Sequence, residues 1–392
     1  MLSDKWESIR RELISSSRFR TCESLRQEGK YVFWNGQKLL HLSSNDYLGI
    51  GTDLALQHQF LSEQLNNAES AGRCLGEGGS RLLCGNTASI EKAEKTWCGW
   101  LGKEKALLFS SGYHANVALF SVLGELNATV FLDEECHASM FDGLRIGRTR
   151  FYRFRHNDPH HLENLLSRYG HKGEQAVIAT EGIFSMEGDT PPLPALCELK
   201  NRFGALLVVD EAHALGVIGP QGRGAAAEEK LDTWVDVVIG TGGKALGASG
   251  GVVGGPQWLI EALINRGRSL IYTTGIPPLL AEWHAWIIPK IQAMEEQRIH
   301  ATRLTSLLQS ALQRKGIPVR GGKGCLLAAI AGPDPKAVEW AKHLRASGFF
   351  VHPIRPPTVP PGTSRIRFSI TALMSQKDIL HLADVCGTLM EL

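Results

Sequence analysis

The chain of 392 residues is 43% hydrophobic and 21% charged, a composition typical of a globular protein with a large buried core. Its net charge of +2 argues against a surface for nucleic acid or for an anionic membrane. The charged start MLSDKWESIR, the absence of a long apolar run and eight scattered cysteines without a Cys-x-x-Cys pair predict a cytoplasmic protein with reduced thiols and no metal site.

The first 285 residues predict an arm followed by a large α/β domain. Residues 1–50 form the predicted N-terminal arm, which leads into the segment HLSSNDYLG. In residues 51–285, short apolar runs without polar alternation are separated by helix-like stretches, which indicates strands buried on both faces of a mostly parallel sheet. The runs lie in ALLFSSGYHAN (106–116), ATVFLDEECHAS (128–139), AVIATEGIFS (176–185), ALLVVDEAHALG (205–216) and DVVIGTGGKALG (236–247).

The remaining residues, 286–392, predict a smaller α+β domain at the C-terminus. Long helical stretches come first, and Pro289 is expected to kink one of them. Short strand candidates (GCLLAAI, FFVHPI and SRIRFSI) then alternate with helical runs. This change of pattern marks the predicted domain boundary.

Polar and small residues follow the predicted strands at the point where each strand ends. They are Gly112, Tyr113, His137, Glu181, Asp210, His213, Thr241 and Lys244. Ligands of open α/β sheets bind at the carboxyl ends of the strands, and parallel strands bring those ends to one edge. The sequence therefore predicts that these eight residues converge on a single site.

Each of these residues, taken alone, also has an ordinary structural explanation. Asp210 and Glu211 could cap a helix, His137 could be a hydrogen-bonded core histidine, and Lys244 could be a solvated lysine in a surface turn. Together they match pyridoxal phosphate, which needs a lysine for a Schiff base, a carboxylate beside its ring nitrogen and helix N-terminal N–H groups for its phosphate. Neither a Walker A motif nor a Gly-x-Gly-x-x-Gly motif after a strand competes for the site.

Nine motifs, from about Ser43 to the C-terminus, occur in the order found in one enzyme family. They are SNDYLG, GGSRLLCGN, SSGYHAN, DEECHAS, EGIFSMEGD, VVDEAHALGVIGPQGRG, GTGGKALGASGG, IYTTGIPP and IRPPTVPPGTSRIRFS. In these motifs the chain resembles the α-oxoamine synthases, which are fold-type I enzymes that use pyridoxal 5'-phosphate. Members of this family join an amino acid to an acyl thioester and release carbon dioxide. The resemblance implies a large domain with a mostly parallel sheet, a smaller α+β C-terminal domain and a homodimer with shared active sites.

The resemblance also implies catalytic roles for four of the strand-end residues. Lys244 would form the Schiff base with the cofactor and would move the proton at the α-carbon of the amino acid. Asp210 would pair with the ring nitrogen, and His213 would reach the phenolic oxygen of the ring. His137 would stack on the face of the ring.

Other residues are implied as contacts of the cofactor. The backbone N–H groups of Gly112 and Tyr113, with the hydroxyl of Thr241, would hold the phosphate. Ser185 would lie near the ring oxygen, with Glu181 as its support.

The remaining implied contacts involve the second subunit and the substrate. Thr274 would reach the phosphate that the other subunit holds. Arg365 would bind the carboxylate of the substrate, because a guanidinium group fits a planar carboxylate with two hydrogen bonds. Asn45 and Arg20 would lie at the mouth of the substrate site.

The choice of substrate rests on one segment, RPPTVPPGTSRIR. In this segment the chain is most similar to family members that condense L-alanine with a pimeloyl thioester, carried by coenzyme A or by an acyl carrier protein. Glycine C-acetyltransferase, 5-aminolevulinate synthase and long-chain acyl relatives are the alternatives within the family. A non-catalytic subunit would be expected to lack the lysine, and a nucleotide-binding Rossmann protein would be expected to carry the missing glycine motif.

Five positions depart from the usual pattern of the family. Glu77 replaces a small residue, Gly242 replaces a bulky residue, and Gly275 replaces serine or alanine. Ile90 and Met374 stand where histidine is common. None of these changes removes an implied cofactor contact. Glu77 is expected either to repel a carboxylate on the acyl chain or to pair with a nearby arginine. Gly242 lies in the loop of Lys244, where altered cofactor binding is expected.

Overall fold

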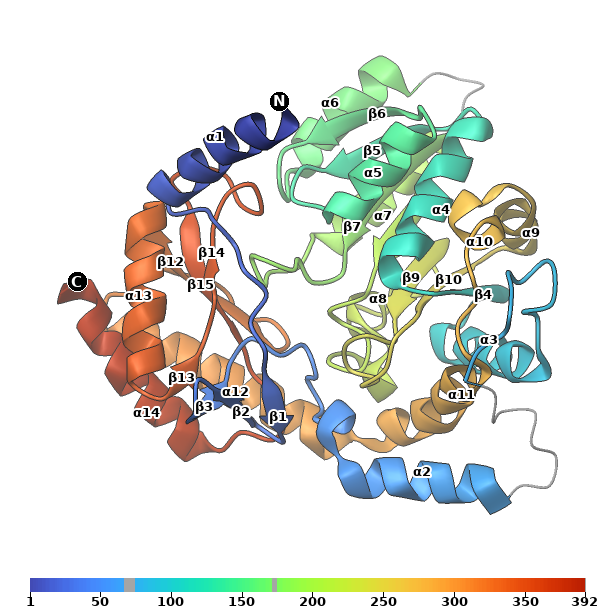
Figure 1. The fold of residues 1–392 in the computed structure, drawn as a ribbon. Helices are drawn as coiled ribbons and strands as arrows, with labels where there is room; N and C mark the ends of the chain where they lie inside the picture. Colours follow the sequence, from blue (N-terminus) through green and yellow to red (C-terminus); the bar gives the residue numbers. More distant parts are fainter. Residues whose placement is uncertain (67–74, 171–174, 392) are drawn as a thin grey trace. The chain divides into compact units, whose positions relative to one another are not determined.

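The computed structural model describes residues 1–66, 75–170 and 175–391, and Figure 1 shows the course of the chain. The chain divides into two compact units. The large unit consists of Asp53–Phe184 and Thr190–Arg298, and the small unit consists of Met1–Thr52, Ser185–Asp189 and Ile299–Leu392.

This division differs from the sequence prediction at two places. The N-terminal residues are not a separate arm, because strand β3 (Gln37–His41) pairs in parallel with strand β13 (Phe349–Phe350) of the small unit. The large unit ends at Arg298 and not at residue 285, because helix α11 (Pro278–Ala293) packs against helix α3 (Ala88–Leu101) of the same unit. Both differences come from contacts between segments that are far apart in the sequence.

A seven-stranded sheet forms the centre of the large unit, in the order β4-β10-β9-β8-β7-β5-β6. Its strands are β4 (Lys105–Phe109), β5 (Thr129–Asp133), β6 (Arg150–Phe154), β7 (Ala176–Glu181), β8 (Leu206–Asp210), β9 (Val237–Thr241) and β10 (Gly251–Gly255). Strands β5 to β9 run parallel, whereas β10 is antiparallel to both of its neighbours. The predicted α/β class with a mostly parallel sheet is therefore confirmed.

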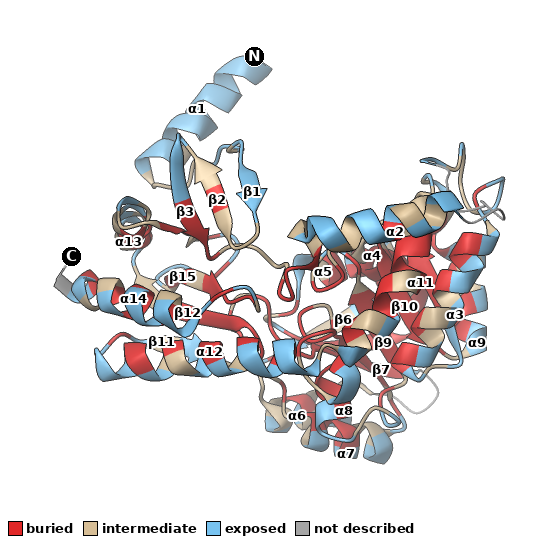
Figure 2. Ribbon diagram, turned by 90° about the horizontal axis from the view of Figure 1, so that it is seen from below, coloured by how far each residue is buried: buried red, intermediate tan, exposed pale blue. Residues whose placement is uncertain are grey.

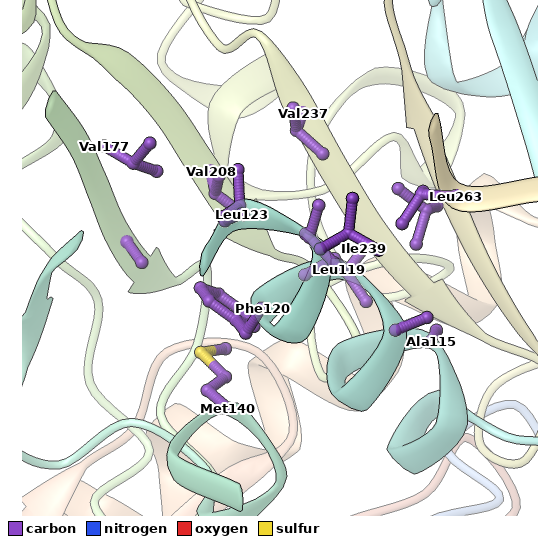
Figure 3. Close-up of a cluster of buried hydrophobic side chains, with 14 of the residues drawn as sticks. Ala115, Leu119, Phe120, Leu123, Met140, Val177, Val208, Val237, Ile239 and Leu263 are labelled. Carbon is purple, nitrogen blue, oxygen red and sulfur yellow. The ribbon is translucent and has the colours of Figure 1, made fainter. Parts of the chain in front are cut away.

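Helices cover both faces of this sheet, because its strands are apolar on both sides. One face packs against α4 (Gly112–Glu125), α5 (Ala138–Ile146), α9 (Gln257–Arg266) and α10 (Arg268–Ile271). Figure 3 shows this core, where Leu119 and Phe120 of α4 lie near Val208 and Ile239 of the strands. The other described helices of the unit are α2 (Leu54–Asn66), α3, α6 (Pro159–Tyr169), α7 (Leu193–Phe203), α8 (Ala225–Glu228) and α11, with the short 3-10 helix η3 (Pro220–Gly222). In Figure 2, β9 and β10 are buried along nearly their whole length.

Helices α4 and α5 approach closely because α5 has a glycine at the contact. A Cβ atom on Gly143 would lie 2.9 Å from the Cβ of Phe120 and 3.0 Å from the carbonyl oxygen of Asn116. The exposed face of α3 offers a contrast, since a Cβ atom on Gly99 would have no atom within 4 Å. The close packing fixes α4, whose first turn contributes to the site described below.

The small unit contains two four-stranded sheets. The first has the order β1-β2-β3-β13, and the second has the order β11-β12-β15-β14. Their further strands are β1 (Arg26–Glu28), β2 (Tyr31–Trp34), β11 (Val319–Gly321), β12 (Leu326–Gly332), β14 (Pro353–Ile354) and β15 (Ser364–Ser369). The helices are α1 (Leu2–Ser15), α12 (Glu295–Arg314), α13 (Asp334–Ala346) and α14 (Gln376–Cys386), with the 3-10 helices η1 (Ile50–Thr52) and η4 (Gly387–Glu391). Helix α1 has no buried residue, as Figure 2 shows.

Two kinds of feature are absent from the ranges that the structure describes. No helix there has the length and apolar character needed to cross a membrane. No group of three or more His, Cys, Asp or Glu side chains is placed to hold a metal ion.

The two glycines give a test of the α4–α5 contact. Gly143→Ala should lower the melting temperature of the protein, because the added methyl group must displace Phe120 or the backbone of α4. Gly99→Ala is the matched control and should raise the stability by about 0.5–1 kcal/mol, because alanine restricts the unfolded chain and fits the helix. Thermal unfolding with saturating cofactor would measure both, and equal effects of the two changes would contradict the prediction.

Candidate active site

A cavity of about 150 Å³ lies at the carboxyl ends of the central strands of the large unit. The residues that line it are Gly112, Tyr113, Asn116, His137, Ser139, Glu181, Asp210, Ala212, His213, Ile239, Gly240, Thr241 and Lys244. All eight strand-end residues that the sequence singled out are among them. The structure adds Asn116 and Ser139, which the sequence analysis did not assign.

The register of the parallel strands explains why these residues meet. Glu181 on β7 is the neighbour of Asp210 on β8, and Asp210 is in turn the neighbour of Ile239 on β9. Thr241 is the last residue of β9, and Lys244 follows three residues later. The strands therefore end together, and the side chains after them face the same space.

Asp210 is a buried carboxylate with two hydrogen bonds from neutral donors. Its side chain is 5% exposed. One oxygen accepts a hydrogen bond from Nδ2 of Asn116 at 2.9 Å, and the other accepts one from the backbone N–H of Ala212 at 2.9 Å. Oδ1 of Asn116 is itself buried and has no hydrogen-bond partner among the described residues. The cavity thus presents a fixed negative charge and an unsatisfied acceptor.

His137 precedes α5 as its N-cap residue, and its ring lines the cavity. Its backbone N–H donates to Oε1 of Glu181 at 2.5 Å, and its ring Nδ1 lies 2.7 Å from Oγ of Ser139. Burial lowers the pKa of His137, the charge of Asp210 opposes this shift, and the charge of Lys244 adds to it. The lowered pKa favours a neutral ring, which can cover an aromatic ligand.

The first turn of α4 provides N–H groups at one end of the cavity. Ser111 caps the helix, and its Oγ accepts a hydrogen bond from the N–H of His114 at 3.2 Å. The N–H groups of Gly112 and Tyr113 lie at the start of the helix, where no carbonyl group of the helix can accept from them. A Cβ atom on Gly112 would lie 3.4 Å from Oγ1 of Thr241, an ordinary contact distance, so Thr241 borders this end of the cavity. This end of the cavity suits a phosphate group.

Lys244 lies on a compact loop between β9 and β10. The loop is closed by hydrogen bonds from the N–H of Gly242 to the carbonyl of Gly250 and from the N–H of Ala248 to the carbonyl of Gly242, each 2.9 Å long. The hydroxyl of Thr241 also donates to the carbonyl of Gly250 at 2.9 Å. Lys244 itself is half-buried and lines the cavity.

Glu211, the neighbour of Asp210, has a structural role. Its carboxylate accepts hydrogen bonds from the N–H groups of Ala225 and Ala226, both at 2.9 Å, and so caps α8. Burial raises the pKa of Glu211 to about 7, although these two hydrogen bonds act in the opposite direction. The carboxyl group is packed by two glycines, since a Cβ atom on Gly182 or Gly224 would clash with it. Helix capping, which was an alternative explanation for both acidic residues, therefore applies to Glu211.

Five predicted site residues do not line this cavity. Thr274 belongs to the large unit, and its carbonyl accepts a hydrogen bond from Oγ of Ser110 at 2.9 Å. The other four belong to the small unit and are Arg20, Asn45, Ser185 and Arg365. Their predicted contacts with substrate or cofactor stay predictions.

Arg365 has its charge balanced within the protein. It is 1% exposed, its Nη1 lies 2.5 Å from Oε1 of Glu187, and its Nη2 donates to Oγ1 of Thr363 at 3.0 Å. Arg367, two residues along the same strand, instead donates to Oδ1 of Asn45 at 3.0 Å and to the carbonyl of Ser185 at 3.1 Å. Both of these acceptors are neutral. The sequence analysis passed over Arg367, although it lies on the same face of β15 as Arg365.

Comparison with known proteins places the chain in a family. The family model for aminotransferase class I and II matches residues 37–385, which is most of the chain. The chain belongs to this family.

The relatives of the chain agree with this assignment. A putative 8-amino-7-oxononanoate synthase from Haemophilus influenzae is 36% identical over 97% of this chain and 99% of the relative. The 8-amino-7-oxononanoate synthase of Haemophilus ducreyi is 36% identical over 94% of this chain and 96% of the relative. These matches confirm the resemblance to the α-oxoamine synthases. The protein is a pyridoxal-phosphate-dependent acyltransferase.

Solved structures confirm the fold. A serine palmitoyltransferase from S. paucimobilis with a bound PLP–myriocin aldimine has a TM-score of 0.90 and 27% identity, and the match covers 99% of this chain and 97% of that chain. The 8-amino-7-oxononanoate synthase of Francisella tularensis has a TM-score of 0.75 and 23% identity, over 90% of this chain and 98% of that chain. The fold is that of the fold-type I transferases.

The residues of the cavity fit pyridoxal 5'-phosphate, the cofactor of this enzyme class. Lys244 offers an amine, and Asp210 offers a buried carboxylate that calls for a positive charge such as a protonated ring nitrogen. The N–H groups at the start of α4, with the neighbouring Thr241, offer a cradle for the phosphate. The predicted cofactor is therefore confirmed.

The unusual Glu77 occupies space that the unusual Gly275 leaves open. A Cβ atom on Gly275 would clash with Oε2 of Glu77 and lie 2.8 Å from its Cδ. Both carboxyl oxygens of Glu77 are buried without a hydrogen-bond partner among the described residues. Pairing of Glu77 with an arginine is not seen, because Nη1 of the nearby Arg81 donates to Oε1 of Glu94 at 2.7 Å. Burial raises the pKa of Glu77 to about 7, and the charge of Arg81 opposes this shift.

Two other departures are ordinary core positions. Ile90 is 0% exposed on α3. Met374 is 2% exposed and packs in the core of the small unit. Apolar residues at these places fill space where histidine would need hydrogen-bond partners.

The first prediction for the site concerns Asn116. Asn116→Ala removes the hydrogen bond that orients the Asp210 carboxylate, so the carboxylate can turn away from the ring nitrogen and the dissociation constant of pyridoxal phosphate should rise roughly tenfold or more. Absorbance titration of the apoenzyme would measure it. Ser121→Ala is the control, since this buried hydroxyl on the same helix donates only to the carbonyl of Ala118. Unchanged cofactor affinity in Asn116→Ala would contradict the role.

The second prediction concerns the pH dependence of stability. The pKa of Glu77 is raised from 4.5 to about 7 in the folded protein, so the folded state holds this proton more tightly than the unfolded state. The resulting stabilisation is complete below the unfolded pKa and is lost as the pH rises through the folded pKa, at about 7.

The side chain in Glu77→Gln stays neutral at every pH. Between pH 5 and pH 8 the wild type loses the stabilisation that its proton gives, so the free energy of unfolding of Glu77→Gln should increase relative to that of the wild type. Urea unfolding at several pH values would measure the difference. Glu229→Gln, at an exposed position, should give no such trend. A constant difference between Glu77→Gln and wild type across this pH range would show that Glu77 ionises normally.

Proposed function

We propose that the protein catalyses the decarboxylative condensation of L-alanine with a pimeloyl thioester. The products are 8-amino-7-oxononanoate, carbon dioxide and a free thiol, and the reaction belongs to biotin biosynthesis. The observation that carries the proposal is the cofactor cavity in a chain that is 36% identical to 8-amino-7-oxononanoate synthases over nearly its full length. The acyl carrier would be coenzyme A or an acyl carrier protein.

The residues of the cavity can perform the proton transfers of this reaction. Pyridoxal phosphate, when bound, supplies an electron sink for negative charge at the α-carbon of the amino acid. Asp210 would hold a positive charge on the ring nitrogen, and His137 would cover the ring. Lys244 would take the α-proton and later return a proton to the same carbon. The N–H groups of Gly112 and Tyr113 would hold the phosphate.

The small unit has a basic cavity that suits the far end of a pimeloyl group. It has a volume of about 690 Å³, and its walls include Arg20, Lys342, Arg345 and Arg355 with Glu23 as the one acidic residue. Glu23 accepts a hydrogen bond from Arg345 at 3.2 Å, which leaves the other three cations without this counter-charge. Arg355 has a buried Nε with no hydrogen-bond partner among the described residues. We propose that the terminal carboxylate of the acyl chain binds here.

Arg367 is our proposed partner for the carboxylate of the amino acid. Its acceptors, Asn45 and Ser185, are neutral, whereas the guanidinium group of Arg365 already contacts Glu187. An incoming carboxylate would therefore gain more from Arg367 than from Arg365. The two arginines can be distinguished by experiment. If Arg367 binds the carboxylate, Arg367→Lys should raise the KM for alanine more than Arg365→Lys does, and the opposite result would support Arg365.

A sister activity is the second candidate. The serine palmitoyltransferase match, with its TM-score of 0.90, favours a long-chain acyl donor in place of a pimeloyl group. Glycine C-acetyltransferase and 5-aminolevulinate synthase activities belong to the same alternative. For either candidate we propose a homodimer in which Thr274 would reach the phosphate held by the other subunit.

The decisive assay compares amino acids and acyl donors on the purified holoenzyme. We expect thiol release and carbon dioxide from L-alanine with a pimeloyl thioester, and much less from glycine or serine or from a palmitoyl thioester. Parallel assays with coenzyme A and with acyl carrier protein identify the carrier. Preference for serine with a palmitoyl donor would overturn the proposal and support the second candidate.

The basic cavity makes a finer prediction about the acyl carboxylate. The wild type should use the free acid of the pimeloyl thioester with a kcat/KM about tenfold or more above that of its terminal methyl ester, because the ester cannot pair with a guanidinium group. Arg355→Gln should remove most of this preference without a change in the KM for alanine. Arg314→Gln, an exposed arginine outside the cavity, should keep it. Equal preference in wild type and Arg355→Gln would exclude this cavity as the carboxylate site.

A further inference from the structure

A buried histidine from α11 lies against the loop that carries Lys244. His284 is 0% exposed. Its Nε2 lies 2.7 Å from the carbonyl oxygen of Ser249, near the end of the loop, and its Nδ1 lies 3.0 Å from Nε1 of Trp97 on α3. The ring therefore connects two helices of the large unit to the loop of the catalytic lysine.

The hydrogen bonds fix the tautomer of His284. An indole N–H can only donate, so Nδ1 must accept the hydrogen bond from Trp97. Nε2 then carries the proton and donates to the carbonyl of Ser249. Burial lowers the pKa of His284 to about 4, although the hydrogen bond to Ser249 opposes the shift. The ring is neutral at physiological pH, and both of its nitrogens are satisfied.

The same ring occupies the space beside Gly242. A Cβ atom on Gly242 would lie 2.5 Å from Nε2 of His284 and 2.5 Å from the carbonyl oxygen of Ser249. A Cβ atom on Gly250, at the other end of the loop, would lie 3.0 Å from Cε1 of the ring. His284 thus contacts both ends of the segment that holds Lys244, and a side chain at residue 242 cannot coexist with it in this arrangement.

We propose that His284 is a positioning residue for Lys244. The ring fills the volume next to Gly242 and holds the carbonyl of Ser249, so that the closed loop presents Lys244 to the cofactor in one orientation. Trp97 holds the ring in turn, through its N–H group and through an edge contact with ring centroids 5.8 Å apart. Misplacement of a reacting group by about 1 Å can reduce a rate about 100-fold. By holding the loop, His284 would therefore affect the rate of the reaction in which Lys244 takes part. The proposal depends on the cofactor and not on which acyl donor the enzyme uses.

The test uses His284→Leu and His284→Gln in the holoenzyme. Leucine has a similar volume but leaves Trp97 Nε1 and the Ser249 carbonyl without a partner, whereas glutamine can both accept from Trp97 and donate to Ser249. In His284→Leu we expect the pH midpoint of the visible absorbance of the bound cofactor to shift by about half a unit or more. Release of the cofactor should be about tenfold faster, and kcat should fall with little change in the KM for alanine. His284→Gln should restore all three values toward wild type.

A merely structural role predicts a different pattern. In that case His284→Leu would lower the melting temperature but leave the absorbance midpoint and the rate of cofactor release as in the wild type, and this result would overturn the proposal. If His284→Leu does not fold, Trp97→Phe serves in its place, because it removes the donor to Nδ1 while keeping an aromatic ring at this buried position, and it should move the same values in the same direction. Unchanged values in Trp97→Phe would then refute the proposal.

The contact with Gly242 is tested by a double-mutant cycle. Gly242→Ala alone should weaken cofactor binding, because the methyl group meets the imidazole ring. In the background of His284→Ala the clash with the ring is gone and the carbonyl of Ser249, the other atom that the methyl group meets, is no longer held by the ring, so adding Gly242→Ala should have a smaller effect. The two changes should therefore be strongly non-additive in the cofactor dissociation constant. Additive effects would show that the ring does not act on the loop through Gly242.

Discussion

The buried charge of Asp210 is the constraint on which the rest of the site depends. Its side chain is 5% exposed and accepts hydrogen bonds from two neutral donors, Asn116 and the N–H of Ala212. Neutral donors compensate a buried carboxylate only in part, and a charge in this position calls for an opposite charge. The protonated ring nitrogen of pyridoxal phosphate has that charge. Binding of the cofactor would therefore add an opposite charge beside Asp210, in a cavity that Lys244 also lines, and the register of β7, β8 and β9 places the other groups around it.

The position of the site could be predicted from the sequence because it follows from local pattern and one general rule. Apolar runs identify buried strands, and parallel strands bring their carboxyl ends together, so Asp210 and Lys244 could be placed at one edge before any contact was known. Asn116 and Ser139 could not be assigned in this way. They lie within the motifs SSGYHAN and DEECHAS, but the contacts of Asn116 with Asp210 and of Ser139 with His137 form only when α4 and α5 pack on the sheet.

The division into units and the roles of the arginines were harder to predict for the same reason. Strand β3 pairs with a two-residue strand more than 300 positions away, and no local pattern indicates such a partner. Arg365 and Arg367 are two residues apart on one strand, lie on the same face and carry the same guanidinium group, so sequence alone cannot distinguish them. The difference lies in the acceptors, since Glu187 is an anion and Asn45 and Ser185 offer only neutral oxygens.

Beside each of the two unusual glycines, the side chain of a residue from elsewhere in the chain fills the space that the glycine leaves. Gly242 leaves space that the ring of His284 fills, and Gly275 leaves space that the carboxyl group of Glu77 fills. The physical outcomes differ, because His284 has a partner on each nitrogen, whereas Glu77 has none on either oxygen. The ring of His284 makes one hydrogen bond to the loop, at the carbonyl of Ser249, and is itself held by the N–H group of Trp97, which restricts the loop. Glu77 introduces a group that is neutral only below about pH 7, so the segment next to Thr274 becomes sensitive to pH. Each of these glycines is therefore best understood together with the residue that fills the space beside it, which is His284 for Gly242 and Glu77 for Gly275.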